Sequence, residues 1–163
     1  MSFTGLPERL TRNVCIHTVM WALASAGAAW AQAPNLTGTW EMDTTKSQVA
    51  DGRSMSMVIA AVANKIKIEA TIHDKSGKEA TAAFICAPDG KECDFDEAGH
   101  KSKMSMWFSG DSLNVAKTDG PPGDKINEWK LQTSGEGKVL TLTVTHIEPS
   151  GADETLVFSK RAT

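Results

Sequence analysis

Cys86 and Cys93 are the residues whose type and spacing most directly suggest chemistry, because they are the only two cysteines after residue 31. An even pair of cysteines forms a disulfide in an oxidising compartment, and the alternative is two free thiols that only pack. If Asp89-Gly90 makes a two-residue turn, the cysteines face each other, as do the phenylalanines two positions outside them. If Pro88 opens a bulged turn instead, the first cysteine and the first phenylalanine each face a carboxylate. A core aromatic ring opposite a carboxylate is costly, so the pattern favours the disulfide.

A serine motif is the one apparent catalytic signal. The segment Gly110-Asp111-Ser112-Leu113 spells the nucleophile motif of a hydrolase family. Those enzymes present the serine on a strand-to-helix elbow and use a downstream Asp-x-x-His, whereas this motif falls in an expected β-turn without that partner. We therefore expect no catalytic residue and no enzyme activity.

Histidines and carboxylates give weaker signals. His73 is expected to point outward from its strand, whereas His146 shares the parity of Leu140, Leu142 and Val144 and is expected inside, near a rim. A lone strand histidine usually has a structural role, and the alternative is a ligand contact or an acid-base role. The group Asp94, Asp96, Glu97 and His100 matches no standard metal spacing, so we expect solvated charge, no metal and no cofactor.

The first thirty or so residues have the pattern of a secretory signal. Arg9 and Arg12 form a basic region, and the segment 14–30 is apolar, rich in alanine and free of charge. It ends in two small-x-small sites, and Pro34 blocks the second, so we expect cleavage after Ala31. The chain then comprises a signal peptide, 1–31, and one domain, 32–163, that is secreted or periplasmic.

The predicted mature chain is mildly acidic. Removing Glu8, Arg9 and Arg12 leaves 15 basic and 19 acidic residues, a net charge near −4. No basic stripe is present, so nucleic acid is excluded as a partner. No second long hydrophobic stretch exists, so no membrane span is expected after processing, and the sequence names no protein partner.

Apolar residues in the mature chain recur every second position, which indicates strands rather than helices. Turn clusters such as Asp74-Lys75-Ser76-Gly77 and Ser134-Gly135-Glu136-Gly137 separate about ten such runs. Short connections favour pairing of sequence neighbours, and a long twisted meander closes on itself to remove its edges. We therefore predict an all-β, antiparallel up-and-down barrel of 8–10 strands.

Both ends of this meander resemble calycins, the lipocalins and fatty-acid-binding proteins. Gly38-Thr39-Trp40 is similar to their opening strand, and the segment 155–160 to their closing strand. The resemblance implies that Trp40 plugs one barrel end under a late basic residue, Lys160 or Arg161, and that Gly38 has a structural role. The mature chain also resembles a group of secreted bacterial proteins without an assigned activity, through Lys46-Ser47 and the segment 89–92.

The chain departs from fatty-acid-binding proteins at the carboxylate site. Their inward Arg-x-Tyr pair on the last strand corresponds here to Leu156 and Phe158, and the chain has no tyrosine. The polar segment 44–54 also leaves little room for their helical lid. The resemblance therefore implies the fold without the anion clamp.

Alternation predicts an interior rich in methionine, phenylalanine and aliphatic residues. Such a surface adapts to varied apolar ligands, but it can equally fill a solid core. We interpret the protein as a non-catalytic carrier of a small hydrophobic molecule, and the alternative is a solid barrel that binds a protein or the envelope through exterior Trp107, Trp129 and Ile85. The predicted cavity lining is Met55, Met57, Ile68, Phe84, Met104, Met106, Phe108, Leu142, His146, Leu156 and Phe158.

Overall fold

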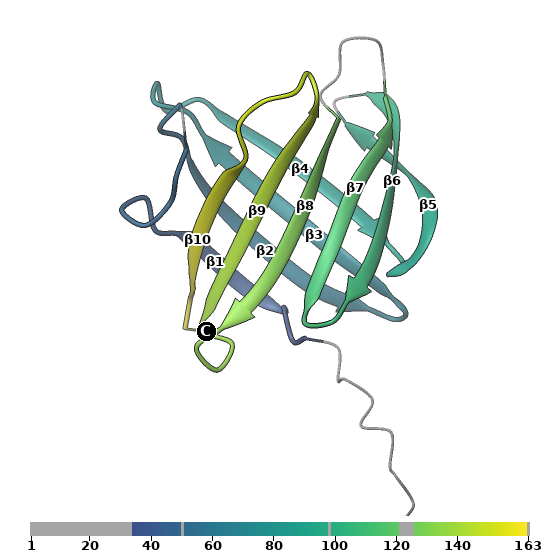
Figure 1. Ribbon diagram of the computed structural model, residues 1–163, viewed down its shortest axis with the longest axis horizontal. Helices are drawn as coiled ribbons and strands as arrows, with labels where there is room; N and C mark the ends of the chain where they lie inside the picture. Colours follow the sequence, from purple (N-terminus) through teal and green to yellow (C-terminus); the bar gives the residue numbers. More distant parts are fainter. Residues whose placement is uncertain (1–33, 50, 98, 121–125, 163) are drawn as a thin grey trace, which may run out of the picture. The chain divides into compact units, whose positions relative to one another are not determined.

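A computed structural model describes residues 34–49, 51–97, 99–120 and 126–162, which contain ten β-strands and no helix (Figure 1). The chain divides into two units, Met1–Trp30 and Ala31–Thr163, and every described residue belongs to the second. The predicted signal peptide and its cleavage site lie outside the described residues. The strands are β1 (Gly38–Met42), β2 (Ser54–Val62), β3 (Lys65–His73), β4 (Glu79–Cys86), β5 (Asp89–Glu97), β6 (His100–Ser109), β7 (Ser112–Asp119), β8 (Ile126–Ser134), β9 (Val139–Glu148) and β10 (Glu154–Lys160).

The strands form one antiparallel sheet in the order β4-β3-β2-β1-β10-β9-β8-β7-β6-β5. In Figure 1 β6 to β10 form the near wall and β1 to β4 the far wall. The first and last strands pair, with Trp40 opposite Lys160 and Met42 opposite Phe158. This pairing joins the first and last strands, and the predicted all-β meander, curled into a nearly closed barrel, is confirmed.

The seam of the barrel lies between β4 and β5, the two end strands of the sheet. A disulfide joins Cys86 to Cys93 across it, with their Cα atoms 6.0 Å apart, and this predicted bond is confirmed. The predicted Asp89-Gly90 turn is wrong, since both residues belong to β5 and Asp89 pairs with β6. Pro88 has no amide hydrogen for a ladder bond, and β5 directs its own hydrogen bonds to β6. The cystine therefore closes a seam where no ladder does.

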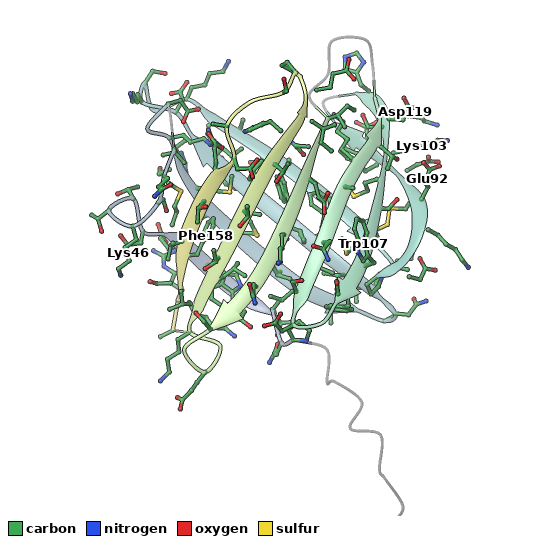
Figure 2. The ribbon with its side chains drawn as sticks, viewed as in Figure 1. Lys46, Glu92, Lys103, Trp107, Asp119 and Phe158 are labelled. Atoms are coloured by element: carbon green, nitrogen blue, oxygen red, sulfur yellow. A yellow bond between two sulfur atoms is a disulfide. The ribbon has the colours of Figure 1, made fainter. Side chains whose placement is uncertain are left out.

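Glu92 shows that the bulged alternative does not form. Its carboxylate lies 3.6 Å from Lys103 Nζ and accepts a hydrogen bond from Thr118 Oγ1, on the outer surface of β5 and β6 (Figure 2). Phe84 instead meets Phe95, with ring centroids 6.1 Å apart. The aromatic pair and the cystine therefore share the inner face, as expected.

Trp40 closes one end of the barrel. Its side chain is completely buried, and its indole Nε1 donates to the Leu36 carbonyl at 2.9 Å. Lys160 Nζ lies 5.2 Å from the indole, whereas Arg161 is exposed and pairs with Glu41. Lys160 is therefore the basic residue that covers Trp40.

Gly38 makes room for this cover. It adopts a φ of 143°, and a Cβ at this position would lie 2.5 Å from Lys160 Cε. A side chain here would meet both backbone strain and the lysine stem, which explains the glycine at the start of β1.

The core follows the alternation of apolar residues along the strands, and one exterior assignment is corrected. Trp129 was expected outside, but it pairs with Val115 and Val144 and packs edge-on against Phe84 at 5.9 Å. Trp129 shares its parity with the buried Leu131, and the two pair with the inward-facing Val144 and Leu142, so the exterior assignment of Trp129 is wrong. The buried apolar residues are Leu36, Trp40, Met42, Met55, Met57, Ile59, Ile68, Ala70, Phe84, Cys86, Met104, Met106, Leu113, Val115, Leu131, Leu140, Leu142, Val144, Leu156 and Phe158.

Candidate binding site

A pocket of about 840 Å³ lies at the barrel end opposite Trp40. The connection from β1 to β2 and the one from β9 to β10 border it. Its apolar wall is formed by Val49, Met55, Ile72, Trp129 and Val144, and its polar wall by Gln48, Asp51, Arg53, Asn127, His146 and the segment 149–154. The apolar wall consists mainly of inward-facing residues of β2, β3, β8 and β9, whereas most of the polar wall consists of residues in the connections and at strand ends.

The connection after β1 is fastened along β10. Asp43 N donates to Val157 O at 2.7 Å, and Gln48 N donates to Thr155 O at 2.7 Å. Ser47 Oγ accepts from Val157 N at 2.9 Å. The segment thus extends the pairing of β1 with β10. Its described part, 43–49 and 51–53, contains no helical lid.

Asp43 folds the start of this connection. Its carboxylate accepts hydrogen bonds from Thr45 N and Oγ1 and pairs with Lys46 Nζ at 2.7 Å. Figure 2 shows Lys46 on the loop that projects beside β10. The hydrogen bond from Lys46, followed by that from Thr45, lowers the pKa of Asp43 to about 2. The loop is therefore organised by a carboxylate that stays ionised well into acid.

A charged group occupies one side of the pocket. Arg53 Nη1 donates to Asp51 Oδ2 at 2.8 Å and to Glu154 Oε1 at 3.3 Å, and Arg53 Nη2 donates to Glu154 Oε2. Burial lowers the pKa of Arg53, but the bonds to Glu154 and Asp51 outweigh it and raise this pKa above its ordinary value. Burial likewise raises the pKa of Asp51, and the bonds from Arg53 reverse the effect. The group ties the start of β2 to the start of β10.

His146 lies in the pocket wall, as its parity predicts. Its Nε2 is 3.8 Å from Glu154 Oε2, and its side chain is mostly buried. The connection after β9 leans on the ring, since a Cβ at Gly151 would lie 3.5 Å from His146 Cβ. Histidine and carboxylate therefore meet at the rim of the pocket.

Aromatic rings extend from the seam to the pocket. Phe95 packs on Phe84, and Phe84 packs on Trp129, both edge-on. Lys117 Nζ lies 5.8 Å from the Phe95 ring. Trp129 thus packs against a core side chain and also lines the pocket, although it was expected on the outer surface.

The predicted cavity residues divide into two groups. Met55 and His146 line the large pocket, and Phe108 lines a second pocket of about 280 Å³ at the Trp40 end, beside Leu36 and Ile59. The other predicted residues line neither pocket and are buried side chains of the core, namely Met57, Ile68, Phe84, Met104, Met106, Leu142, Leu156 and Phe158. Most of the predicted lining is therefore packed core, and the larger of the two pockets lies at the end opposite Trp40.

Several residues of the site were not anticipated. Arg53 and Glu154 are 101 positions apart, and each sits at a strand end where no apolar period marks it. Their only sequence signal is a charged residue one or two positions before an alternating run.

The other chemistry-bearing residues have structural or solvent-facing roles. Ser112 is buried, and its Oγ donates to Ser109 O across the turn between β6 and β7. His73 lies near Glu79 on the surface, and Asp94, Asp96 and His100 are exposed. No group of three or more metal-binding side chains occurs in the described ranges, and no helix there is long and apolar enough to cross a membrane.

Solved structures share this fold at low sequence identity. The chain matches fatty-acid-binding protein 1 of Echinococcus granulosus with a TM-score of 0.57 and 14% identity, over 77% of this chain and 97% of that one. It matches the Schistosoma mansoni fatty acid binding protein in complex with arachidonic acid with a TM-score of 0.54 and 13% identity, over 78% and 96%. It also matches an SAHS protein of Ramazzottius varieornatus with a TM-score of 0.57 and 12% identity, over 80% and 98%.

No family model and no curated protein sequence matches the chain. At 12–14% identity the likeness to these structures concerns the fold alone. The strand order, the pairing of β1 with β10 and these matches together identify the fold as a calycin-like β-barrel.

Proposed function

We propose that the protein is an exported, non-catalytic carrier that holds a small apolar ligand in the large pocket. The observation that carries this proposal is the pocket itself, in which Trp129, Met55, Ile72 and Val144 form an apolar wall at one end of the barrel. Binding sites for small molecules are mostly apolar clefts of roughly 300–1,000 Å³ with a few polar groups, and this pocket falls in that range.

The proposed ligand enters with its apolar part toward Trp129. Met55 adds a flexible thioether to the same wall, which suits ligands of varied shape. The matched structures include fatty-acid-binding proteins, which supports an apolar ligand in a barrel of this kind.

Export is proposed from the N-terminal pattern and is consistent with the cystine between Cys86 and Cys93. Mass spectrometry of the mature protein from its host should find Gln32 at the N-terminus. Full-length protein retained in the cytoplasm would contradict export and leave the carrier proposal standing.

Tryptophan quenching tests the binding site. A long-chain alcohol with bromine on its chain should quench the protein, because Trp129 lies in the pocket wall. Trp129→Phe should lose the saturable part of this quenching. Trp107→Phe is the matched control, since Trp107 lies on β6 away from the pocket (Figure 2), and it should keep that part.

The competing proposal is a barrel that acts as an interaction module. Ile85 is 40% exposed on β4 and fits that role, but Trp129 is inside and Trp107 is partly buried. Absence of saturable quenching in the unaltered protein, together with no uptake of a neutral apolar dye, would reject the carrier and favour the module.

A further inference from the structure

We propose that the pocket selects a cationic or neutral amphiphile and rejects a fatty-acid anion. This inference deepens the proposed carrier function and rests on it. It is argued from the charged side chains that line the pocket and from the hydrogen bonds that already occupy Arg53.

The pocket wall has an excess of negative charge. Three carboxylates line it, Asp51, Asp153 and Glu154, against the single guanidinium of Arg53. These three carboxylates and the guanidinium sum to a charge of −2. An anionic headgroup entering this rim meets repulsion that water only partly screens, whereas an ammonium group is attracted.

Arg53 is occupied by the protein itself. Its Nη1 is bonded to Asp51 and to Glu154, and its Nη2 is bonded to Glu154. A ligand carboxylate would have to displace Glu154 from Arg53. Glu154 is buried, and the pocket wall offers it no second arginine or lysine to pair with. The arginine therefore serves an internal ion pair and does not offer a fork to an incoming anion.

Other positions that would favour an anion lie outside the wall. Lys75 lies against Gly52 beside the rim, and Lys117 lies over Phe95, but neither lines the pocket. The last strand presents Leu156 and Phe158 to the interior, where both are fully buried.

Trp129 adds a feature that favours a cation. Its indole lines the same pocket as the carboxylates. The face of an indole attracts an ammonium group, and carboxylates nearby reinforce that attraction. The same wall thus supplies apolar surface for a chain and two kinds of partner for a positive headgroup.

The test compares three ligands with the same ten-carbon chain: decylamine, decanol and decanoate. The dissociation constant of each ligand is measured by its displacement of a neutral dye, Nile red, from the full mature protein at neutral pH and low salt. We expect the dissociation constant of decylamine to be about tenfold below that of decanoate, with decanol between them. Added salt should narrow the difference.

The double variant Asp51→Asn with Asp153→Asn should bring the amine and the carboxylate within roughly threefold of each other. Both residues are exposed, so the fold should persist. Asp111→Asn, in the turn between β6 and β7, removes one carboxylate outside the pocket wall and should leave the preference unaltered.

Decanoate binding as tightly as decylamine would overturn the inference and leave the carrier proposal intact. If the double variant keeps the same preference for decylamine over decanoate as the unaltered protein, the inference is also overturned, because the charge of the wall would then not cause that preference. If Nile red and all three ligands fail to bind, the carrier proposal and this inference fall together.

Discussion

Replacing Trp40 with alanine should remove much of the stability of the barrel. The side chain is completely buried between β1, β2 and β10, below the stem of Lys160. Its removal creates a cavity at the closed end, and it leaves the Leu36 carbonyl without the indole donor 2.9 Å away.

The magnitude follows from the buried area. A tryptophan buries roughly 200 Å², and at about 25 cal/mol per Å² its transfer contributes at most about 5 kcal/mol. Large-to-small core substitutions of this kind cost about 3–5 kcal/mol. The orphaned carbonyl accounts for about 1–2 kcal/mol of such a loss. Burial is therefore the larger effect, and Trp40→Phe, which keeps a ring but no donor, should lose only about 1–2 kcal/mol.

Equilibrium urea unfolding measures these losses if the slope with denaturant stays constant. Trp107→Ala is the control, because Trp107 is only partly buried on the outer face of β6 and should lose about 1 kcal/mol. A typical domain has only about 5–15 kcal/mol of stability, so Trp40→Phe carries the comparison if Trp40→Ala does not fold. Equal losses at the two tryptophans would refute the assigned inside and outside of the barrel.

Three further perturbations have defined outcomes. Replacing Cys86 and Cys93 with serine should cost about 2–3 kcal/mol by loop entropy and raise hydrogen exchange in β4 and β5, whereas unchanged exchange would show that the seam needs no covalent bond. Arg53→Ala should cost about 1.5–3 kcal/mol, because it leaves a buried carboxylate without its main cation, and the exposed Arg161→Ala should cost less than about 1 kcal/mol. A larger loss at Arg161 in urea unfolding would reverse that ranking. Because the pKa of Asp43 falls from 3.8 to about 2 on folding, its contribution is present above pH 4 and disappears as the pH drops toward 2, so Asp43→Asn should flatten the acid sensitivity of exchange in segment 43–49.

Alternation determined most of the barrel wall. Ile68, Met106 and Leu142 were assigned to the interior from their parity, and all three are completely buried. This works because a strand with one wet face must place every second side chain in the core, and turn clusters mark where each strand ends. The resemblance of the two chain ends correctly implied that β1 pairs with β10.

Two expectations drawn from the sequence were wrong, one about the side of a tryptophan and one about a turn. The exterior assignment of Trp129 overlooked that it shares parity with Leu131, which is completely buried, and the pairing of β5 with β6 moved the expected Asp89-Gly90 turn into a strand. The cystine formed nonetheless, because the inner faces of β4 and β5 approach each other across the seam without a ladder.

The sequence by itself determined the fold class, the strands and the absence of the Arg-x-Tyr clamp at Leu156 and Phe158, since these depend on residue type and on neighbours along the chain. Only the tertiary structure decided that the large pocket lies at the barrel end opposite Trp40 and that most of the predicted lining residues are packed in the core. It also decided that Arg53 is bonded to Glu154 from 101 positions away. Cavities and long-range ion pairs depend on how strand ends and loops meet across a closed sheet, and alternation specifies which face a side chain takes but not what it meets there.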